Sequence, residues 1–246
     1  MPGLSDARHA LSFLTVLPAG RLDHEQAHPG AAAAWFPVVG ALVGGLAGGL
    51  RALTRGALGG SAASILALIL LVALTGALHH DGLADSADAL GVRGDRERRL
   101  AVMRDPRIGV FGALALIAWS LLMVAALAPL DTLDGVRSLV AAAAAGRALA
   151  LVHARAVPPG RPDGLGATFL PSTAAVLVAS AITVAGVLLL CGPVAGGAAL
   201  ACAALTGATV SLWSGRVIGG RTGDTLGATV VLAEAAVCLT LLGFWR

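Results

Sequence analysis

Seven stretches of the chain are long and apolar enough to cross a lipid bilayer, and no other feature limits its fold as strongly. A membrane-spanning helix needs about 20 consecutive, mostly apolar residues. The stretches near this length cover residues 34–54, 61–78, 110–130, 138–154, 173–191, 194–213 and 225–245. They predict an all-α, multi-pass integral membrane helical bundle of about seven transmembrane helices, forming a single membrane-embedded domain over residues 1–246.

The composition agrees with a chain that is solvated mainly by lipid. Hydrophobic residues make up 57% of the chain and charged residues only 13%, whereas a soluble domain carries about 25% charged residues. The net charge is only +3, and all 17 basic residues are arginine. A nucleic-acid-binding protein would cluster far more basic charge, so this class is excluded.

The arginines orient the predicted spans in the membrane. If the loop of residues 79–109 is cytoplasmic, seven spans place the N-terminus and the loops near 156–172 and 214–224 on the same side. Twelve arginines then lie on that side: Arg8, Arg21, Arg93, Arg96, Arg98, Arg99, Arg104, Arg107, Arg155, Arg161, Arg216 and Arg221. Four lie on the other side: Arg51, Arg55, Arg137 and Arg246. Because basic loops stay in the cytoplasm, we expect a protein of the cell inner membrane with its polar motifs on the cytoplasmic side.

The first span is rich in glycine, at positions Gly40, Gly44, Gly45, Gly48 and Gly49. Small residues at this spacing let two helices approach closely. We therefore interpret these glycines as a packing face rather than a ligand-binding loop. The same face could also serve a contact between copies of the chain in a homo-oligomer.

Three carboxylates at the end of the second span give the strongest chemical signal. On a helix, Asp85 lies about 40° from Asp81, and Asp88 lies about 20° away on the other side. Like charges this close repel one another, and a bound divalent cation relieves the repulsion. Oxygen ligands favour Mg²⁺ or Mn²⁺ over zinc. A solvated acidic helix end is the alternative, but such faces usually interleave Lys or Arg four residues along.

Other polar residues are candidates for substrate contacts or proton transfer. Arg104 and Arg107 carry planar guanidinium groups that suit phosphate oxygens, although orientation in the membrane also explains basic residues there. His79 could be a metal ligand, a general base or an interfacial histidine. Arg147 and Glu234 lie inside apolar spans, where a charge is normally paired or functional. They are a possible ion pair, and they also motivate the hypothesis of a membrane transporter.

A glycine-rich segment, residues 219–227, precedes the last span. Glycines let backbone N–H groups approach an anion, and the start of a helix adds its positive dipole end. The candidates for substrate binding here are Gly220, Arg221, Thr222 and Gly223. Asp224 is a candidate catalytic residue, although it could equally be the N-cap of the last helix.

Taken together, these motifs resemble the cobalamin synthase family, also called adenosylcobinamide-GDP ribazoletransferase. The matching stretches occur in the family's order and cover residues 13–18, 35–40, 79–88, 104–109, 146–147, 163–166 and 219–227. The chain departs from the family's usual pattern at His80 and Ala89. The resemblance implies a membrane enzyme that needs Mg²⁺. It would join adenosylcobinamide-GDP to α-ribazole, or to α-ribazole 5′-phosphate, and release GMP.

The resemblance also leads to a hypothesis for the roles of the residues. Asp81, Asp85 and Asp88 would hold Mg²⁺ at the diphosphate. Arg104, Arg107 and Arg221 would contact phosphate oxygens, and His79 or Asp224 would act as the base. The nearest rival is a CDP-alcohol phosphotransferase of phospholipid synthesis. That motif expects an arginine where this chain has Ala84 and Asp85.

Overall fold

Every regular element that the computed structural model describes, over residues 3–20 and 29–245, is helical. The longer helices are α1 (Leu4–Leu14), α3 (Phe36–Leu74), α4 (Leu78–Gly91), α6 (Val110–Leu127), α7 (Thr132–Ala156), α9 (Thr173–Cys191), α10 (Pro193–Trp213) and α11 (Gly223–Trp245). Short helical segments between them are α2 (Pro29–Ala32), η1 (Ala33–Trp35), α5 (Arg96–Val102), α8 (Leu165–Thr168) and the π-helical η2 (Ser214–Ile218). The prediction of an all-α bundle is confirmed.

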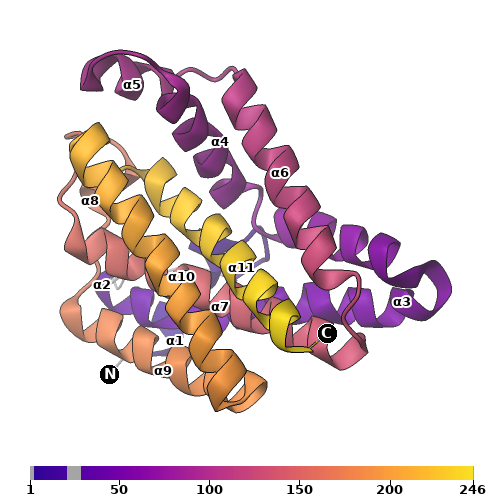
Figure 1. Ribbon diagram of the computed structural model, residues 1–246. Helices are drawn as coiled ribbons and strands as arrows, with labels where there is room; N and C mark the ends of the chain where they lie inside the picture. The colour runs from indigo at the N-terminus through magenta and orange to yellow at the C-terminus, as the bar shows by residue number, and fades with distance from the viewer. Residues whose placement is uncertain (1–2, 21–28, 246) are drawn as a thin grey trace.

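Six helical segments within the described residues are long and apolar enough to cross a membrane, and the first of them contains a break. This segment, Gly30–Leu74, includes α3, whose backbone is non-helical at Gly59 with φ 77° and ψ 168°. Glycine adopts positive φ without a steric penalty. Figure 1 shows α3 folding back on itself at its right-hand end. With the two arms of α3 counted separately, the prediction of about seven spans is confirmed.

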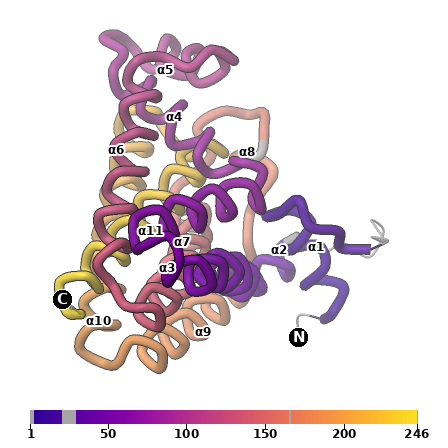
Figure 2. The backbone as a smooth tube through the Cα atoms, turned by 90° about the vertical axis from the view of Figure 1, so that its right-hand side faces the viewer, coloured from indigo at the N-terminus to yellow at the C-terminus, as the bar shows by residue number. Residues whose placement is uncertain are grey.

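The boundary after the second predicted span differs from the expectation. The second arm of α3 ends at Leu74, and the chain turns through Ala77, which has a left-handed backbone (φ 59°), before α4 begins at Leu78. The acidic motif therefore lies on a separate helix rather than at the end of a span. Figures 1 and 2 show α4 leading towards α5, which lies at one end of the bundle.

The glycine-rich part of α3 packs directly against α7. A Cβ atom added at Gly44 would overlap the carbonyl oxygen of Leu139, and one added at Gly40 would overlap that of Ala143. A Cβ atom at Gly48 would lie 3.0 Å from a backbone atom of α7. The interpretation as a packing face is confirmed for Gly40, Gly44 and Gly48, whereas a Cβ atom at Gly49 would meet no atom within 4 Å. A helix of the same chain occupies this face. That the chain forms a homo-oligomer stays a prediction.

Two arginines are fully enclosed in the bundle, and both have partners. The Nη1 atom of Arg147 on α7 lies 2.7 Å from the Oε1 atom of Glu234 on α11, and both side chains are only 1% exposed. The predicted pairing of these two residues is confirmed. Arg51, on the first arm of α3, donates hydrogen bonds to the carbonyl oxygens of Leu127 and Leu130 at 2.6 and 2.7 Å. It thereby binds carbonyl groups at and just beyond the end of α6, where the regular helical hydrogen bonds stop.

The contact between α3 and α7 predicts opposite effects for two glycines of the same helix. Gly44→Ala should lower the thermal unfolding midpoint of the detergent-purified protein, because the new methyl group pushes α3 away from α7. Gly49→Ala meets no atom within 4 Å and should leave the midpoint unchanged or raise it, since alanine favours a helix by about 1 kcal/mol over glycine. Equal midpoints for the two variants would contradict this packing.

Candidate active site

The backbones of α4 and α11 touch where each helix has a glycine. A Cβ atom at Gly82 would lie 2.6 Å from the carbonyl oxygen of Asp224, and one at Gly227 would lie 3.1 Å from a carbonyl oxygen in the first turn of α4. No larger residue fits at this crossing without moving a helix. The contact places Asp81 and Asp85 on α4 beside Asp224 in the first turn of α11.

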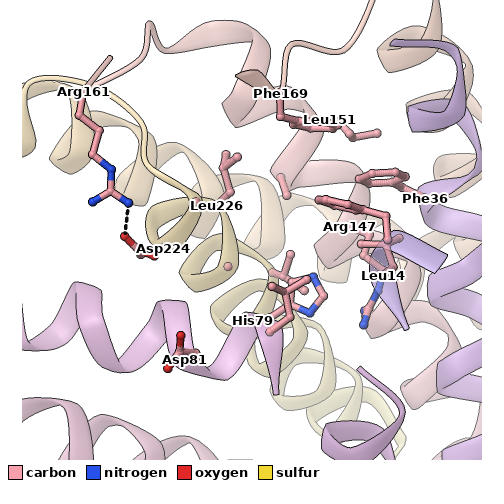
Figure 3. Close-up of a pocket in the computed structure, with 16 residues that line it drawn as sticks. Leu14, Phe36, His79, Asp81, Arg147, Leu151, Arg161, Phe169, Asp224 and Leu226 are labelled. Carbon is pink, nitrogen blue, oxygen red and sulfur yellow. Dashed lines mark ion pairs between the residues drawn. The ribbon is translucent and has the colours of Figure 1, made fainter. Parts of the chain in front are cut away.

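The carboxylates at this crossing influence one another strongly. The pKa of Asp85 is raised to about 7, first by burial and then by the negative charges of Asp224, Asp81 and Asp88. The Oδ2 atom of Asp224 is buried and accepts no hydrogen bond from the described residues. Its nearest cation is the Nη2 atom of Arg161 at 3.6 Å, marked by the dashed line in Figure 3. The cluster therefore carries negative charge that the described part of the chain compensates incompletely.

Asp88 differs from the other carboxylates because it anchors the start of α6. Its Oδ2 atom accepts a hydrogen bond from the N–H of Gly109 at 2.7 Å, and its Oδ1 atom accepts one from the N–H of Gly112 at 2.8 Å. The three aspartates do lie on one helix, as predicted. However, α6 engages both oxygens of Asp88, whereas Asp81 and Asp85 face the region of Asp224.

Within the described residues, no group of three or more histidine, cysteine or acidic side chains is arranged to hold a metal ion by itself. Such a closed cage is not needed for Mg²⁺, which is often held by one or two carboxylates together with waters and substrate phosphates. The Oδ2 atom of Asp224, which accepts no hydrogen bond from the described residues, and the mutual repulsion at Asp85 fit that type of site. The donors are all oxygens, which is the ligand chemistry Mg²⁺ prefers.

Two cavities meet at Asp81. The first has a volume of about 200 Å³, and its polar lining residues are His79, Asp81, Arg147, Arg161 and Asp224. Figure 3 shows Asp81, Asp224 and Arg161 on one side of this cavity and Phe36 and Phe169 on the other. The second cavity measures about 560 Å³ and is lined by His80, Asp81, Asp85 and the loop that contains Arg104 and Arg107. A substrate in either cavity would reach the same carboxylate.

The two histidines at the start of α4 face different cavities. His79 is buried in the first cavity, where burial and the positive charge of Arg147 hold the pKa of its imidazole well below the usual value. It is therefore neutral at pH 7. His80 packs edge-on against Trp119, with 4.4 Å between ring centroids. This contact gives His80 a packing role against α6.

Arg104 and Arg107 line the second cavity in exposed ion pairs. Arg104 donates to both carboxylate oxygens of Asp163 at 2.8 Å, and Arg107 lies 2.7 Å from an oxygen of Asp105. Exposed pairs of this kind contribute little stability, about 0–1 kcal/mol. A phosphate group can therefore displace the carboxylates without a large cost.

Most of the glycine-rich segment holds the chain in place rather than facing a cavity. Arg221 is 3% exposed and donates hydrogen bonds to the carbonyl oxygens of Val157 and Phe169. A Cβ atom at Gly220 would overlap the backbone of Gly160. These contacts tie the segment to the loop between α7 and α9, and the predicted contact of Gly220 and Arg221 with a phosphate stays a prediction.

The start of α11 is capped by Thr222, so the alternative that Asp224 is the N-cap is wrong. The Oγ1 atom of Thr222 accepts a hydrogen bond from the N–H of Thr225, and the Oγ1 atom of Thr225 accepts one from the N–H of Thr222. This reciprocal pair satisfies two N–H groups of the helix end. It leaves the side chain of Asp224 free to face the cavity beside Gly223.

The sequence analysis assigns no functional role to several residues of the first cavity. Arg161 entered the sequence analysis only as an orienting charge, yet it lies in the first cavity beside Asp224. Phe13, Phe36 and Phe169 belong to stretches that are far apart in the chain, and they meet only in the folded structure. A segment-by-segment reading does not bring such residues together.

Comparison with known proteins agrees with this geometry. The family model described as cobalamin-5-phosphate synthase matches residues 6–242. This chain belongs to the cobalamin-5-phosphate synthase family. The resemblance noted from the motifs is thus confirmed. No solved structure matches the chain.

Relatives within the family share sequence along most of the chain. The chain is 40% identical to a protein of Bradyrhizobium diazoefficiens, over 98% of this chain and 94% of the relative. It is 39% identical to a protein of Mesorhizobium japonicum, over 96% of this chain and 92% of the relative. A protein of Stutzerimonas stutzeri is 44% identical over 70% of this chain and 71% of its own length. All three are named adenosylcobinamide-GDP ribazoletransferase.

The different surroundings of Asp85 and Asp88 predict opposite effects on stability. In EDTA, Asp85→Asn should raise the thermal unfolding midpoint, because it removes one of several repelling carboxylates. Asp88→Asn should lower the midpoint, since it weakens two hydrogen bonds to α6, each worth about 2 kcal/mol when the acceptor is charged. If both variants were destabilised to the same extent, the assignment of Asp88 as the anchor of α6 and Asp85 as unpaired would be wrong.

Proposed function

We propose that this chain is a ribazoletransferase, with Mg²⁺ held by the carboxylates between α4 and α11. It joins adenosylcobinamide-GDP to α-ribazole, or to α-ribazole 5′-phosphate, and releases GMP. The family match over nearly the whole chain carries the activity. The single structural observation that supports the metal is the approach of Asp85, Asp81 and Asp224 at the crossing of the two helices.

Asp81, Asp85 and Asp224 are the residues that would hold Mg²⁺. The Oδ2 atom of Asp224, which accepts no hydrogen bond from the described residues, and the raised pKa of Asp85 both fit a site that a cation completes. When bound, Mg²⁺ supplies positive charge that offsets the charge of the diphosphate and of the departing GMP. Asp88 supports the cluster from its position against α6 and adds negative charge to it.

The reaction is a displacement at phosphorus. A hydroxyl oxygen of the acceptor forms a bond to the β-phosphorus, which carries cobinamide, and the bond from this phosphorus to the oxygen of GMP breaks. Arg104 and Arg107 contact phosphate oxygens from the second cavity, exchanging their present carboxylate partners. The proton of the attacking hydroxyl passes to His79 or to Asp224, since both line the first cavity.

The rival functions are less well supported. The family match favours the ribazoletransferase over a CDP-alcohol phosphotransferase of phospholipid synthesis. The transporter hypothesis rested on Arg147 and Glu234 inside the spans. These two residues form a buried ion pair. The pairing explains why charged residues are found inside the spans, so a transport role is not needed to account for them.

Replacing Asp85 should abolish turnover while leaving the fold intact. Asp85→Asn should lower the rate of GMP release from adenosylcobinamide-GDP and α-ribazole by about 100-fold or more, because loss of a metal ligand removes several kcal/mol of stabilisation. Asp134→Asn, at the start of α7, is the matched control and should retain the wild-type rate. EDTA should stop the wild-type enzyme, and added Mg²⁺ should restore it. Wild-type activity in Asp85→Asn would dismiss the proposed metal site.

We also propose that the active site faces the cytoplasm of a cell whose inner membrane holds the protein. The support is the concentration of arginine in and around α5, which lies at one end of the bundle together with α4 (Figure 2). Two arginines of the orientation count, Arg21 and Arg246, lie outside the described residues. The remaining ones still favour this orientation.

Cysteine labelling tests the orientation. In a Cys202→Ser background, Arg98→Cys places a thiol on exposed α5, and Thr132→Cys places one at the exposed start of α7. A membrane-impermeant maleimide should label Arg98→Cys in inverted vesicles but not in intact spheroplasts. Thr132→Cys should show the reverse pattern. Labelling of Arg98→Cys in spheroplasts would place the active site outside the cytoplasm.

A further inference from the structure

Three of the five phenylalanines of the chain form one aromatic cluster. Phe13 comes from α1, Phe36 from the start of α3, and Phe169 from the segment after α8. Their ring centroids lie 5.6 to 5.9 Å apart, and the ring planes differ by only 10 to 20°. All three line the first cavity. The cavity therefore has an aromatic end, opposite the end with Asp81 and Asp224 (Figure 3).

The size of the first cavity limits what it can hold. Its volume is about 200 Å³, below the range of about 300–1,000 Å³ that is usual for sites of drug-sized ligands. A corrin ring with its side chains is far larger than this space. One planar heterocyclic base does fit, so the choice lies between the guanine of the donor and the benzimidazole of the acceptor.

The chemistry of the lining favours benzimidazole. The aromatic end consists of Phe13, Phe36 and Phe169 with Leu14 and Leu151 beside them. Guanine carries N–H donors along one edge, and apolar side chains would leave these donors unpaired, at a cost of about 1–3 kcal/mol each. The base of α-ribazole has no N–H donor when joined to its ribose. It carries apolar edges and a single unsubstituted ring nitrogen, which accepts a hydrogen bond.

Arg147 complements that ring nitrogen. Arg147 lines the same cavity, and its Nε and Nη2 atoms, which are enclosed in the protein, have no hydrogen-bond partner among the described residues. The pair with Glu234 fixes its position through Nη1. A guanidinium offers only donors, so it matches a base with one acceptor and leaves the donors of guanine unmatched.

We infer that the cluster of Phe13, Phe36 and Phe169 binds the benzimidazole base of the acceptor, with Arg147 as the donor to its free ring nitrogen. The inference rests on the proposed function. The ribose of the acceptor then extends along the cavity towards Asp81 and Asp224. The nucleotide diphosphate of the donor lies in the second cavity, between the same Asp81 and the loop of Arg104 and Arg107. The two substrates thus approach the carboxylates from opposite sides of α4.

Binding of α-ribazole, whose base is dimethylbenzimidazole, tests this assignment without turnover when the donor is left out. It is measured by equilibrium dialysis on the full chain in EDTA, with GMP as competitor. Phe169→Leu should weaken binding about tenfold, in line with the loss of one aromatic stacking contact. Phe169→Tyr should keep most of the affinity. Phe244→Leu, which changes an exposed phenylalanine of α11, should bind like the wild type.

Steady-state kinetics of the same variants give the second measurement. Phe169→Leu should raise the KM for α-ribazole about tenfold and leave the KM for adenosylcobinamide-GDP unchanged. Competition by GMP for the α-ribazole site, or a rise in the donor KM instead, would assign the aromatic end to guanine and overturn the inference. Unchanged binding in both Phe169→Leu and Phe36→Leu would also overturn it. The metal proposal fails separately: an Asp85→Asn variant that keeps its activity and still binds α-ribazole would refute the metal site alone.

Discussion

The direct contact between the backbones of α4 and α11 is the interaction on which the site depends. Helices in lipid gain little from burying apolar surface, so close packing at small residues contributes much of their association. Gly82 and Gly227 make this possible here. The closeness has an electrostatic cost, because it brings Asp81, Asp85 and Asp224 together. The packing of two helices thus holds carboxylates in an arrangement that they would not adopt by themselves.

Charges elsewhere in the bundle are compensated, which sets this cluster apart. Arg51 is surrounded by carbonyl oxygens at the end of α6, Arg147 pairs with Glu234, and Arg221 donates to the carbonyl oxygens of an adjacent loop. An uncompensated charge in a membrane protein is costly and usually functional. The acidic cluster at the α4–α11 crossing fits that description, and Arg51 and Arg221 fit a structural one.

The sequence predicts features that depend on local periodicity or on length. It identifies the spans, the separation of the first two of them, the glycine face of α3 and the shared helix of Asp81, Asp85 and Asp88. It does not predict that Asp88 anchors α6 or that Thr222 caps α11. The meeting of Phe13 with Phe169 is equally invisible in the sequence. The Asp88 anchor and the phenylalanine contact join residues that are distant in the chain, so a local pattern cannot specify them. The cap at Thr222 depends on where α11 begins, and helix boundaries are the least reliable part of a prediction from sequence.

The hydrogen bonds of Arg51 have a consequence for the order of membrane insertion. Its acceptors, the carbonyl oxygens of Leu127, Leu130 and Asp131, follow it by 76 to 80 positions in the chain. During synthesis the ribosome delivers the guanidinium to the membrane well before these acceptors exist. The first arm of α3 therefore cannot settle in lipid with its charge satisfied until α6 has been made. Only the bond from Arg51 to the hydroxyl of Ser64 can form earlier, so the packing of the first arm of α3 is completed after α6 has been inserted.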